Sequence, residues 1–181
     1  MLFLVYINDL DDNIVSAVLK FADGGKLLHS VSDKDEIDLV QNDLNKLAMW
    51  SKDWQMPFNL DKCKVMHVGG NNQEYIYQLN NKVIASSELE KDLGVWTNKD
   101  LKCGSQCSKA ASKANQMLGL IKRTIVQKDK DVILPLYKSL VRPHLDYCVP
   151  AWKPHLRKDI TLLENVQKRA TKLVAGLEKL A

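Results

Sequence analysis

The sequence has no apolar run long enough to cross a lipid bilayer. Its longest, MLFLVYI at residues 1–7, is far shorter than the roughly 20 residues of a spanning helix. No basic segment precedes it, as one would in a secretory signal peptide. These absences argue against a membrane anchor or a secreted protein. We therefore expect an intracellular protein, in the nucleus or the cytoplasm, with no membrane partner.

Cysteine is scarce and unevenly spread. Cys63, Cys103, Cys107 and Cys148 do not resemble the framework of a small secreted disulfide protein, so we expect free thiols. Two spacings raise the question of zinc, because Cys63 and His67 are four apart, as are Cys103 and Cys107. Structural zinc sites usually combine closer Cys-x2-Cys pairs with matched histidines. The spacings therefore favour packing roles, and Cys148 is expected to be a small buried residue.

Internal repeats and low-complexity segments are also absent, and 45% hydrophobic residues in 181 allow one ordinary domain or two small ones. The charge, in contrast, is unevenly distributed. Residues 1–95 contain 9 Lys/Arg and 15 Asp/Glu, a net charge of −6, whereas residues 96–181 contain 17 and 7, a net charge of +10. A basic half predicts a polyanionic partner such as nucleic acid, and solvated helix faces are the alternative explanation.

The first half has the pattern of an α+β domain with an antiparallel sheet. Two short apolar runs flank Asp23-Gly24-Gly25, whose residue types suit a hairpin turn. A capping-box spacing at Ser32 then starts an amphipathic helix that reaches about Trp50. Further strands are expected at 63–68, in a hairpin that turns at Asn80-Asn81, and at 91–96.

The second half has the pattern of a small helical bundle. Apolar residues recur at helical steps over 110–125, 132–140 and 160–173. Arg142-Pro143 is expected to end the second helix, in which Pro135 is an awkward interior residue unless it falls in the first turn. The first and third helices are basic on their outward faces, at Lys109, Lys113, Lys122, Arg123, Lys168, Arg169 and Lys172. We therefore predict two domains, 1–96 and 97–181, with those seven cations as candidate nucleic-acid contacts.

Seven strings occur in one order along nearly the whole chain. They are LFLVYINDL at 2–10, KFADGGKL at 20–27, WQMPFNLDKCKVMHVG at 54–69, KDLGVW at 91–96, KANQMLGLIKR at 113–123, LYKSLVRPHLDYCVPAW at 136–152 and LENVQKRATKL at 163–173. In this order they resemble the reverse transcriptase of non-LTR, LINE-type, jockey-like retrotransposons. The resemblance implies an RNA-directed DNA polymerase, with a partial antiparallel palm at 1–96 and a helical thumb at 97–181. Its implied partner is an RNA or DNA template–primer duplex.

The resemblance also implies a metal-dependent nucleotidyltransferase reaction. In that family, two Mg²⁺ ions stabilise the attacking 3′-hydroxyl and the leaving group. An upstream palm Asp and the Asp pair of a Phe/Tyr-Ala-Asp-Asp hairpin hold these ions. Asp23 matches the first Asp of that pair, and Gly24 replaces the second. The fingers, the upstream Asp strand and a substrate-pocket Gln-Gly loop are expected to precede residue 1. We therefore expect a truncated, inactive polymerase domain that does not bind Mg²⁺ productively.

Lys62, in the string FNLDKC, matches a lysine thought to protonate the departing pyrophosphate as a general acid. The alternative is an ordinary exposed lysine beside a strand. Three functions remain open for the whole chain. They are a degenerate polymerase fragment that still binds nucleic acid over residues 105–175, a helical protein–protein module derived from a retrotransposon, and an enzyme that borrows the missing carboxylate from another retrotransposon-derived chain.

Overall fold

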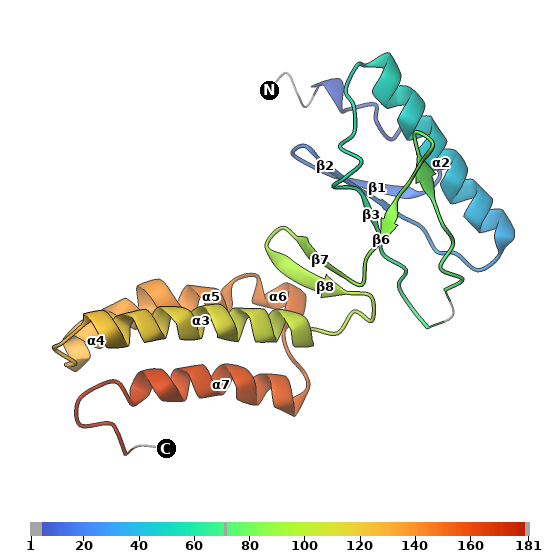
Figure 1. Cartoon of the computed structure of the whole chain (residues 1–181). Coiled ribbons are helices and arrows are strands. Elements are labelled where there is room, and N and C mark those ends of the chain that lie inside the picture. The colour runs from blue at the N-terminus through green and yellow to red at the C-terminus, as the bar shows by residue number, and fades with distance from the viewer. Residues whose placement is uncertain (1–4, 71, 180–181) are drawn as a thin grey trace. The chain divides into compact units, whose positions relative to one another are not determined.

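The computed structural model describes residues 5–70 and 72–179 (Figure 1). The chain divides into two compact units, Met1–Glu88 and Leu89–Ala181, called unit 1 and unit 2 below. Helices occur together with small, mainly antiparallel sheets, which is compatible with the predicted α+β class. Within the described residues, no helix combines the length and the apolar character needed to cross a membrane.

The core of unit 1 forms where its long helix packs against short strands. Ile37 and Val40 of the helix are buried together with Tyr77, Leu79 and Ile84. The elements of this unit are β1 (Ala17–Phe21), β2 (Gly24–Leu28), α2 (Lys34–Asp53), β3 (Lys64–Val65), β4 (Gln78–Leu79), β5 (Lys82–Val83) and β6 (Ala85–Ser86).

The strands of unit 1 do not join into the single antiparallel sheet that the sequence predicts. β1 pairs with β2 and β4 with β5, both antiparallel, whereas β3 pairs with β6 in parallel. β3 is short because the alternation over 63–68 reflects packing, not strand pairing. Cys63 and Val65 contact the core around α2, and the buried His67 stacks on the Tyr77 ring with centroids 6.3 Å apart.

Two local predictions in unit 1 are close to the structure. The turn at Asn80-Asn81 is confirmed, because both residues have the positive φ, 51° and 60°, of a tight hairpin turn. The helix predicted from Ser32 begins one residue later than its capping pattern suggests. Asp33 is the N-cap, and its carboxylate accepts a hydrogen bond from the Glu36 backbone N–H at 3.0 Å.

Asp43 of α2 is fully buried and connects the helix to the start of β1. Its carboxylate accepts hydrogen bonds from the backbone N–H and hydroxyl of Ser16, both at 2.8 Å, and from the Val15 N–H at 3.1 Å. Lys46 pairs with the other oxygen at 3.0 Å. Burial raises the pKa of Asp43, but the hydrogen bonds from Ser16 and Lys46 outweigh burial, and the pKa is lowered. The ionised carboxylate therefore stabilises this packing.

Unit 2 is built around one long helix, α3, which lies alongside α5 and α7 (Figure 1). The predicted apolar face is confirmed at Ala114 and Ile121, which are buried with Val141, Val166 and Ala170. The elements of this unit are β7 (Leu89–Asp92), β8 (Val95–Asn98), α3 (Gly104–Thr124), α4 (Lys130–Leu136), η1 (Tyr137–Val141), α5 (Arg142–Asp146), α6 (Val149–Trp152) and α7 (Arg157–Thr171).

Arg142-Pro143 does not end the second helix of the bundle, contrary to the prediction. α4, the π-helical turn η1 and α5 follow one another without a break, and Arg142-Pro143 starts α5. The Arg142 N–H donates to the carbonyl of Tyr137, five residues back. This wider turn lets the helical course continue past Pro143, which has no N–H to donate. Ser139 donates its hydroxyl to the Pro135 carbonyl at 2.9 Å.

The single strand predicted at 91–96 is the hairpin β7–β8, and it belongs to unit 2. The division at Glu88 and Leu89 therefore precedes the predicted boundary at 96/97, and unit 2 is not purely helical. β8 is held to α3, because the Trp96 N–H donates to the Gln106 side-chain oxygen at 3.0 Å. The contacts of β8 with the first residues of α3 therefore place the hairpin in unit 2, although the composition changes only after Trp96.

The turn of the β7–β8 hairpin requires glycine. Gly94 has a φ of 86°, and a Cβ added there would lie 2.9 Å from the Tyr147 ring. The Tyr147 hydroxyl donates to the Leu93 carbonyl at 2.8 Å, so the ring cannot easily move away. Gly119 in α3 is different, because its φ is outside the left-handed region and a Cβ there would meet nothing within 4 Å.

We expect Asp43→Asn to lower the free energy of unfolding by about 2–3 kcal/mol at neutral pH, because a buried charged hydrogen-bond network is broken. The pKa of Asp43 is lowered in the folded state, so this contribution is present above the unfolded pKa of about 3.9 and is lost as pH falls through the folded pKa. Urea unfolding at neutral and acidic pH measures both effects. Asp38→Asn, at an exposed position of α2, is the control. Equal losses in the two variants contradict the assignment.

We expect opposite signs from two glycine substitutions in unit 2. Gly94→Ala should destabilise the protein by about 1–3 kcal/mol, because it combines an unfavourable φ with a clash against Tyr147. Gly119→Ala should stabilise it by about 0.5–1 kcal/mol, because alanine favours a helix interior. Denaturant unfolding of both variants measures the difference. The same sign for both would show that the turn is not constrained as described.

Candidate functional site

Asp23 lies at the exposed tip of the β1–β2 hairpin. Phe21 pairs with Gly24, so the two residues of the turn are Ala22 and Asp23, and Ala22 takes a positive φ of 49°. The turn predicted at Asp23-Gly24-Gly25 is therefore one residue earlier than expected. The register of the strands places both glycines in β2. Asp23 therefore remains in the turn, and the residue after it, Gly24, has no side chain that could bind a metal ion.

Lys62 is exposed in a turn that precedes β3. Its backbone N–H donates to the Asn59 carbonyl at 3.0 Å, which fixes the turn. In the part of the chain that the structure describes, the Lys62 ammonium and the Asp23 carboxylate form no ion pair with each other. The two residues that the resemblance singles out are thus not joined by a direct contact.

The seven cations predicted to contact nucleic acid are all exposed in unit 2. They lie on α3, on α7 and at the residue that caps the end of α7, and they are Lys109, Lys113, Lys122, Arg123, Lys168, Arg169 and Lys172. Lys109 is engaged by an aromatic ring, since its ammonium lies 5.0 Å from the centroid of Trp96.

A groove in unit 2 collects three of these cations and adds a fourth. It has a volume of about 520 Å³. Its lining residues are Asn115, Leu118, Gly119, Lys122, Lys128, Arg169, Lys172, Leu173 and Glu178. Lys128 belongs to the connection after α3. The sequence pattern did not include it, because that pattern considered only the basic faces of the helices. That connection is fixed, because the Lys128 carbonyl accepts a hydrogen bond from the Ala175 N–H at 2.9 Å.

The groove is positively charged and partly preorganised. Arg169 donates one guanidinium N–H to the Asn115 side-chain oxygen at 3.1 Å, which leaves its other donors for a ligand. The one acidic lining residue, Glu178, accepts a hydrogen bond from the Gly176 N–H at 3.1 Å. Backbone hydrogen bonds from Glu178 and Gly176 lower the pKa of this carboxyl. Four cations face one acidic group, an arrangement that attracts phosphate.

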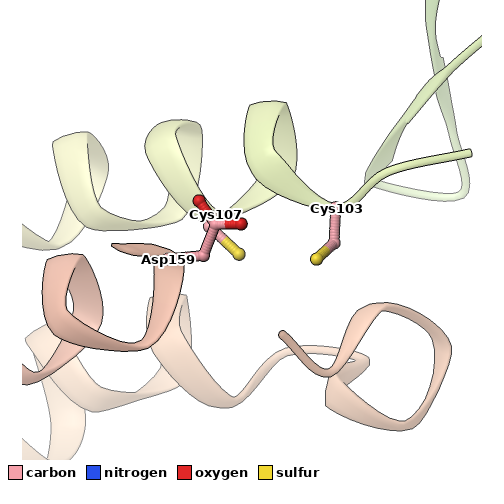
Figure 2. A group of neighbouring side chains, drawn as sticks. All are labelled: Cys103, Cys107 and Asp159. Carbon is pink, nitrogen blue, oxygen red and sulfur yellow. The ribbon is translucent and has the colours of Figure 1, made fainter. Parts of the chain in front are cut away.

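A second cluster brings together side chains that the sequence does not associate. Cys103 and Cys107 from the start of α3 meet Asp159 from the first turn of α7 (Figure 2). Their ligand atoms lie within 4.8 Å of one another, and within the described residues this is the one group of three or more potential metal ligands. Asp23 is not part of it. Cys63 and His67, the other pair with suggestive spacing, do not belong to such a group either.

The environment of these cysteines differs from residue to residue. The pKa of the Cys107 thiol is raised to about 12, mainly by burial and in smaller part by the neighbouring Cys103 and Asp159. Cys148 is exposed, contrary to the prediction that it is a buried apolar residue. It precedes α6 with a φ of 54°, so it lies in a tight connection and not in the core.

Comparisons with known proteins do not identify either site. No family model, curated protein or solved structure matches the chain. Function is therefore inferred from the residues and their geometry.

Gly24 is a position at which a second carboxylate fits the hairpin. Its φ lies outside the left-handed region, and an added Cβ would lie 3.4 Å from the Phe21 carbonyl oxygen, an ordinary contact. We expect Gly24→Asp to change the free energy of unfolding by less than about 1 kcal/mol. Gly94→Asp, with its positive φ and its clash against Tyr147, is the control expected to lose more. Comparable losses in urea unfolding would contradict the described turn.

Proposed function

We propose that this chain is part of a LINE-type reverse transcriptase, a partial palm followed by thumb-like helices, whose function here is sequence-independent binding of a template–primer duplex. The family reaction, RNA-templated DNA synthesis from a primer 3′-hydroxyl, is not included in the proposal. Gly24 takes the place of the second carboxylate of the metal-binding hairpin in this sequence. A lone carboxylate at Asp23 is a poor holder of two Mg²⁺ ions.

The observation that carries the proposal is the groove with four cations in unit 2. Lys122, Lys128, Arg169 and Lys172 line one concave surface. Lysine and arginine contact phosphate oxygens without reading bases, so such a surface binds the backbone of a duplex and not its sequence. Arg169 is the best-placed of the four, because Asn115 already orients its guanidinium.

The surrounding charge supports a polyanion over a small anion. Residues 96–181 contain 17 Lys/Arg against 7 Asp/Glu, and further exposed cations continue along α3 and α7 beyond the groove. A long phosphate backbone can contact the groove and these helices at once, whereas a single phosphate occupies only the groove. The logarithm of the affinity for a duplex therefore rises with the number of phosphates that these cations neutralise.

We expect duplex binding to fall steeply with added salt, because each neutralised phosphate releases counterions. Four contacts predict a loss of roughly 100-fold between about 50 mM and about 200 mM salt. Fluorescence anisotropy with a labelled RNA–DNA template–primer duplex measures it, and a duplex of scrambled sequence should bind equally. A groove variant with all four lining cations replaced by Gln should bind at least tenfold more weakly and show a shallower salt dependence. These replacements are Lys122→Gln, Lys128→Gln, Arg169→Gln and Lys172→Gln.

The matched control removes the same charge from exposed lysines outside the groove lining. Its replacements, none of which lies on α3 or α7, are Lys34→Gln, Lys52→Gln, Lys138→Gln and Lys153→Gln. This control should keep most of the parent's affinity and salt dependence. Equal losses in the two variants would show that only net charge matters, and absence of binding at low salt would refute the proposed function.

A further inference from the structure

The start of α3 and the first turn of α7 bring three metal-ligating side chains to one point. Cys103 directly precedes α3, Cys107 lies in its first turn, and Asp159 is the third residue of α7. Each of the three offers one ligand atom, and all three atoms lie within 4.8 Å of one another (Figure 2). The cluster therefore spans two helices that are distant in sequence.

Two of the three side chains are buried, and one carboxylate oxygen of Asp159 has no hydrogen-bond partner among the described residues. Cys107 is 0% exposed and Asp159 is 5% exposed. The Oδ2 atom of Asp159 has no hydrogen-bond partner among the described residues, and no lysine, arginine or histidine of that part of the chain forms an ion pair with it. A buried carboxylate is costly without a compensating charge or hydrogen bond. A positive charge or a hydrogen-bond donor supplied from outside these three side chains would offset that cost.

The backbone holds the three ligands in place. The Cys107 N–H donates to the Cys103 carbonyl at 2.9 Å, which closes the first turn of α3. The Asp159 N–H donates to the Leu156 carbonyl at 3.0 Å, which fixes the start of α7. Trp152 and Ala110 are buried against Cys107 and shield the cluster on one side. The ligands are therefore positioned by packing that exists without an ion.

The ligand types indicate which ion fits. Two sulfur ligands and one carboxylate oxygen suit a thiophilic divalent ion, of which Zn²⁺ is the commonest in proteins, whereas Mg²⁺ and Ca²⁺ take oxygen ligands. Around tetrahedral Zn²⁺, two sulfur atoms are separated by about 3.8 Å, since each Zn–S bond is about 2.3 Å. The sulfur–sulfur separation, at most 4.8 Å, needs to contract by no more than about 1 Å. Side-chain rotation supplies this movement, because Cys103 precedes the helix proper.

We propose that Cys103, Cys107 and Asp159 bind one Zn²⁺ ion, with water as the fourth ligand. Cys103 is partly exposed, so its side of the cluster is the one that admits water. Two thiolates and one carboxylate provide three negative charges against two positive charges on the ion. The ion would fasten the start of α3 to the start of α7, and the site is independent of both the duplex-binding groove and Asp23.

Cobalt substitution tests the proposal directly. The reduced, metal-free chain of 181 residues is titrated with Co²⁺, and the expected result is one equivalent bound, with a thiolate-to-cobalt charge-transfer band and the visible bands of a tetrahedral site. Zn²⁺ should displace the cobalt and raise the melting temperature of the protein. A protein that binds no Co²⁺, or binds it without a thiolate band, overturns the site.

Variants assign the ligands. Cys103→Ser and Asp159→Asn should each weaken Co²⁺ affinity at least tenfold and abolish the rise in melting temperature with Zn²⁺. Cys63→Ser and Cys148→Ser, which alter the cysteines outside the cluster, should leave both unchanged. Circular dichroism of the metal-free variants shows whether they are folded. If Cys103→Ser does not fold, Asp159→Asn still tests the ligand assignment. The amide has nearly the same shape as the carboxylate, so this variant is expected to fold.

Two outcomes contradict the three-ligand site. One is Co²⁺ affinity that is unchanged in Asp159→Asn, which would remove the carboxylate from the ligand set. The other is Co²⁺ affinity that is unchanged in folded Cys103→Ser, which would remove that sulfur atom from the ligand set. Neither outcome affects the duplex-binding measurement, so the two proposals fail or succeed separately.

Discussion

The packing of α3 against α7 is the contact on which both proposed sites depend. Ala111 and Ala114 of α3 are small and buried, so Val166 and Ala170 of α7 can approach closely. Because the apolar faces of both helices are used in this contact, their cationic faces remain outward. The same packing that excludes water from the core of unit 2 thus creates a charged groove at its surface.

The two helices run in the same direction. The cysteine–aspartate cluster therefore lies at the starts of both helices, and the cationic groove lies toward their ends. Gly104 and Asp159 meet at the starts of the helices, and Asn115 bonds to Arg169 further along. Free backbone N–H groups at the starts of the helices favour a carboxylate such as that of Asp159, whereas free carbonyls at the ends favour cations such as Lys122. From Cys107 to Lys122 the helix rises about 22 Å, at 1.5 Å per residue. Over such a distance, mutational effects at the two sites are expected to add independently.

Local patterns predicted those parts of the structure that neighbouring residues decide. Helical periodicity located α2, α3 and α7, and residue type located the turn at Asn80-Asn81. The register of β1 and β2 decides instead that Ala22 takes the positive φ, although glycine is the residue type that favours it. Asp159 follows Cys107 by 52 positions, and they meet only through helix packing, which no local pattern encodes. Sequence spacing therefore argued against a cysteine metal site that the three-dimensional arrangement favours.

The Asp23 turn shows why a fold and its chemistry have different requirements. A hairpin needs paired strands and a backbone that can turn, and β1 and β2 satisfy both with Ala22 and Asp23 at the tip. Two-metal catalysis also needs several carboxylate oxygens that converge within a few tenths of an ångström, and Gly24 supplies none. Contact between exposed cations and phosphates needs only charge and access, so it tolerates small displacements. In a reverse transcriptase, loss of one carboxylate at such a hairpin would therefore remove much more of the chemistry than of the affinity for nucleic acid, and the proposed function is accordingly binding.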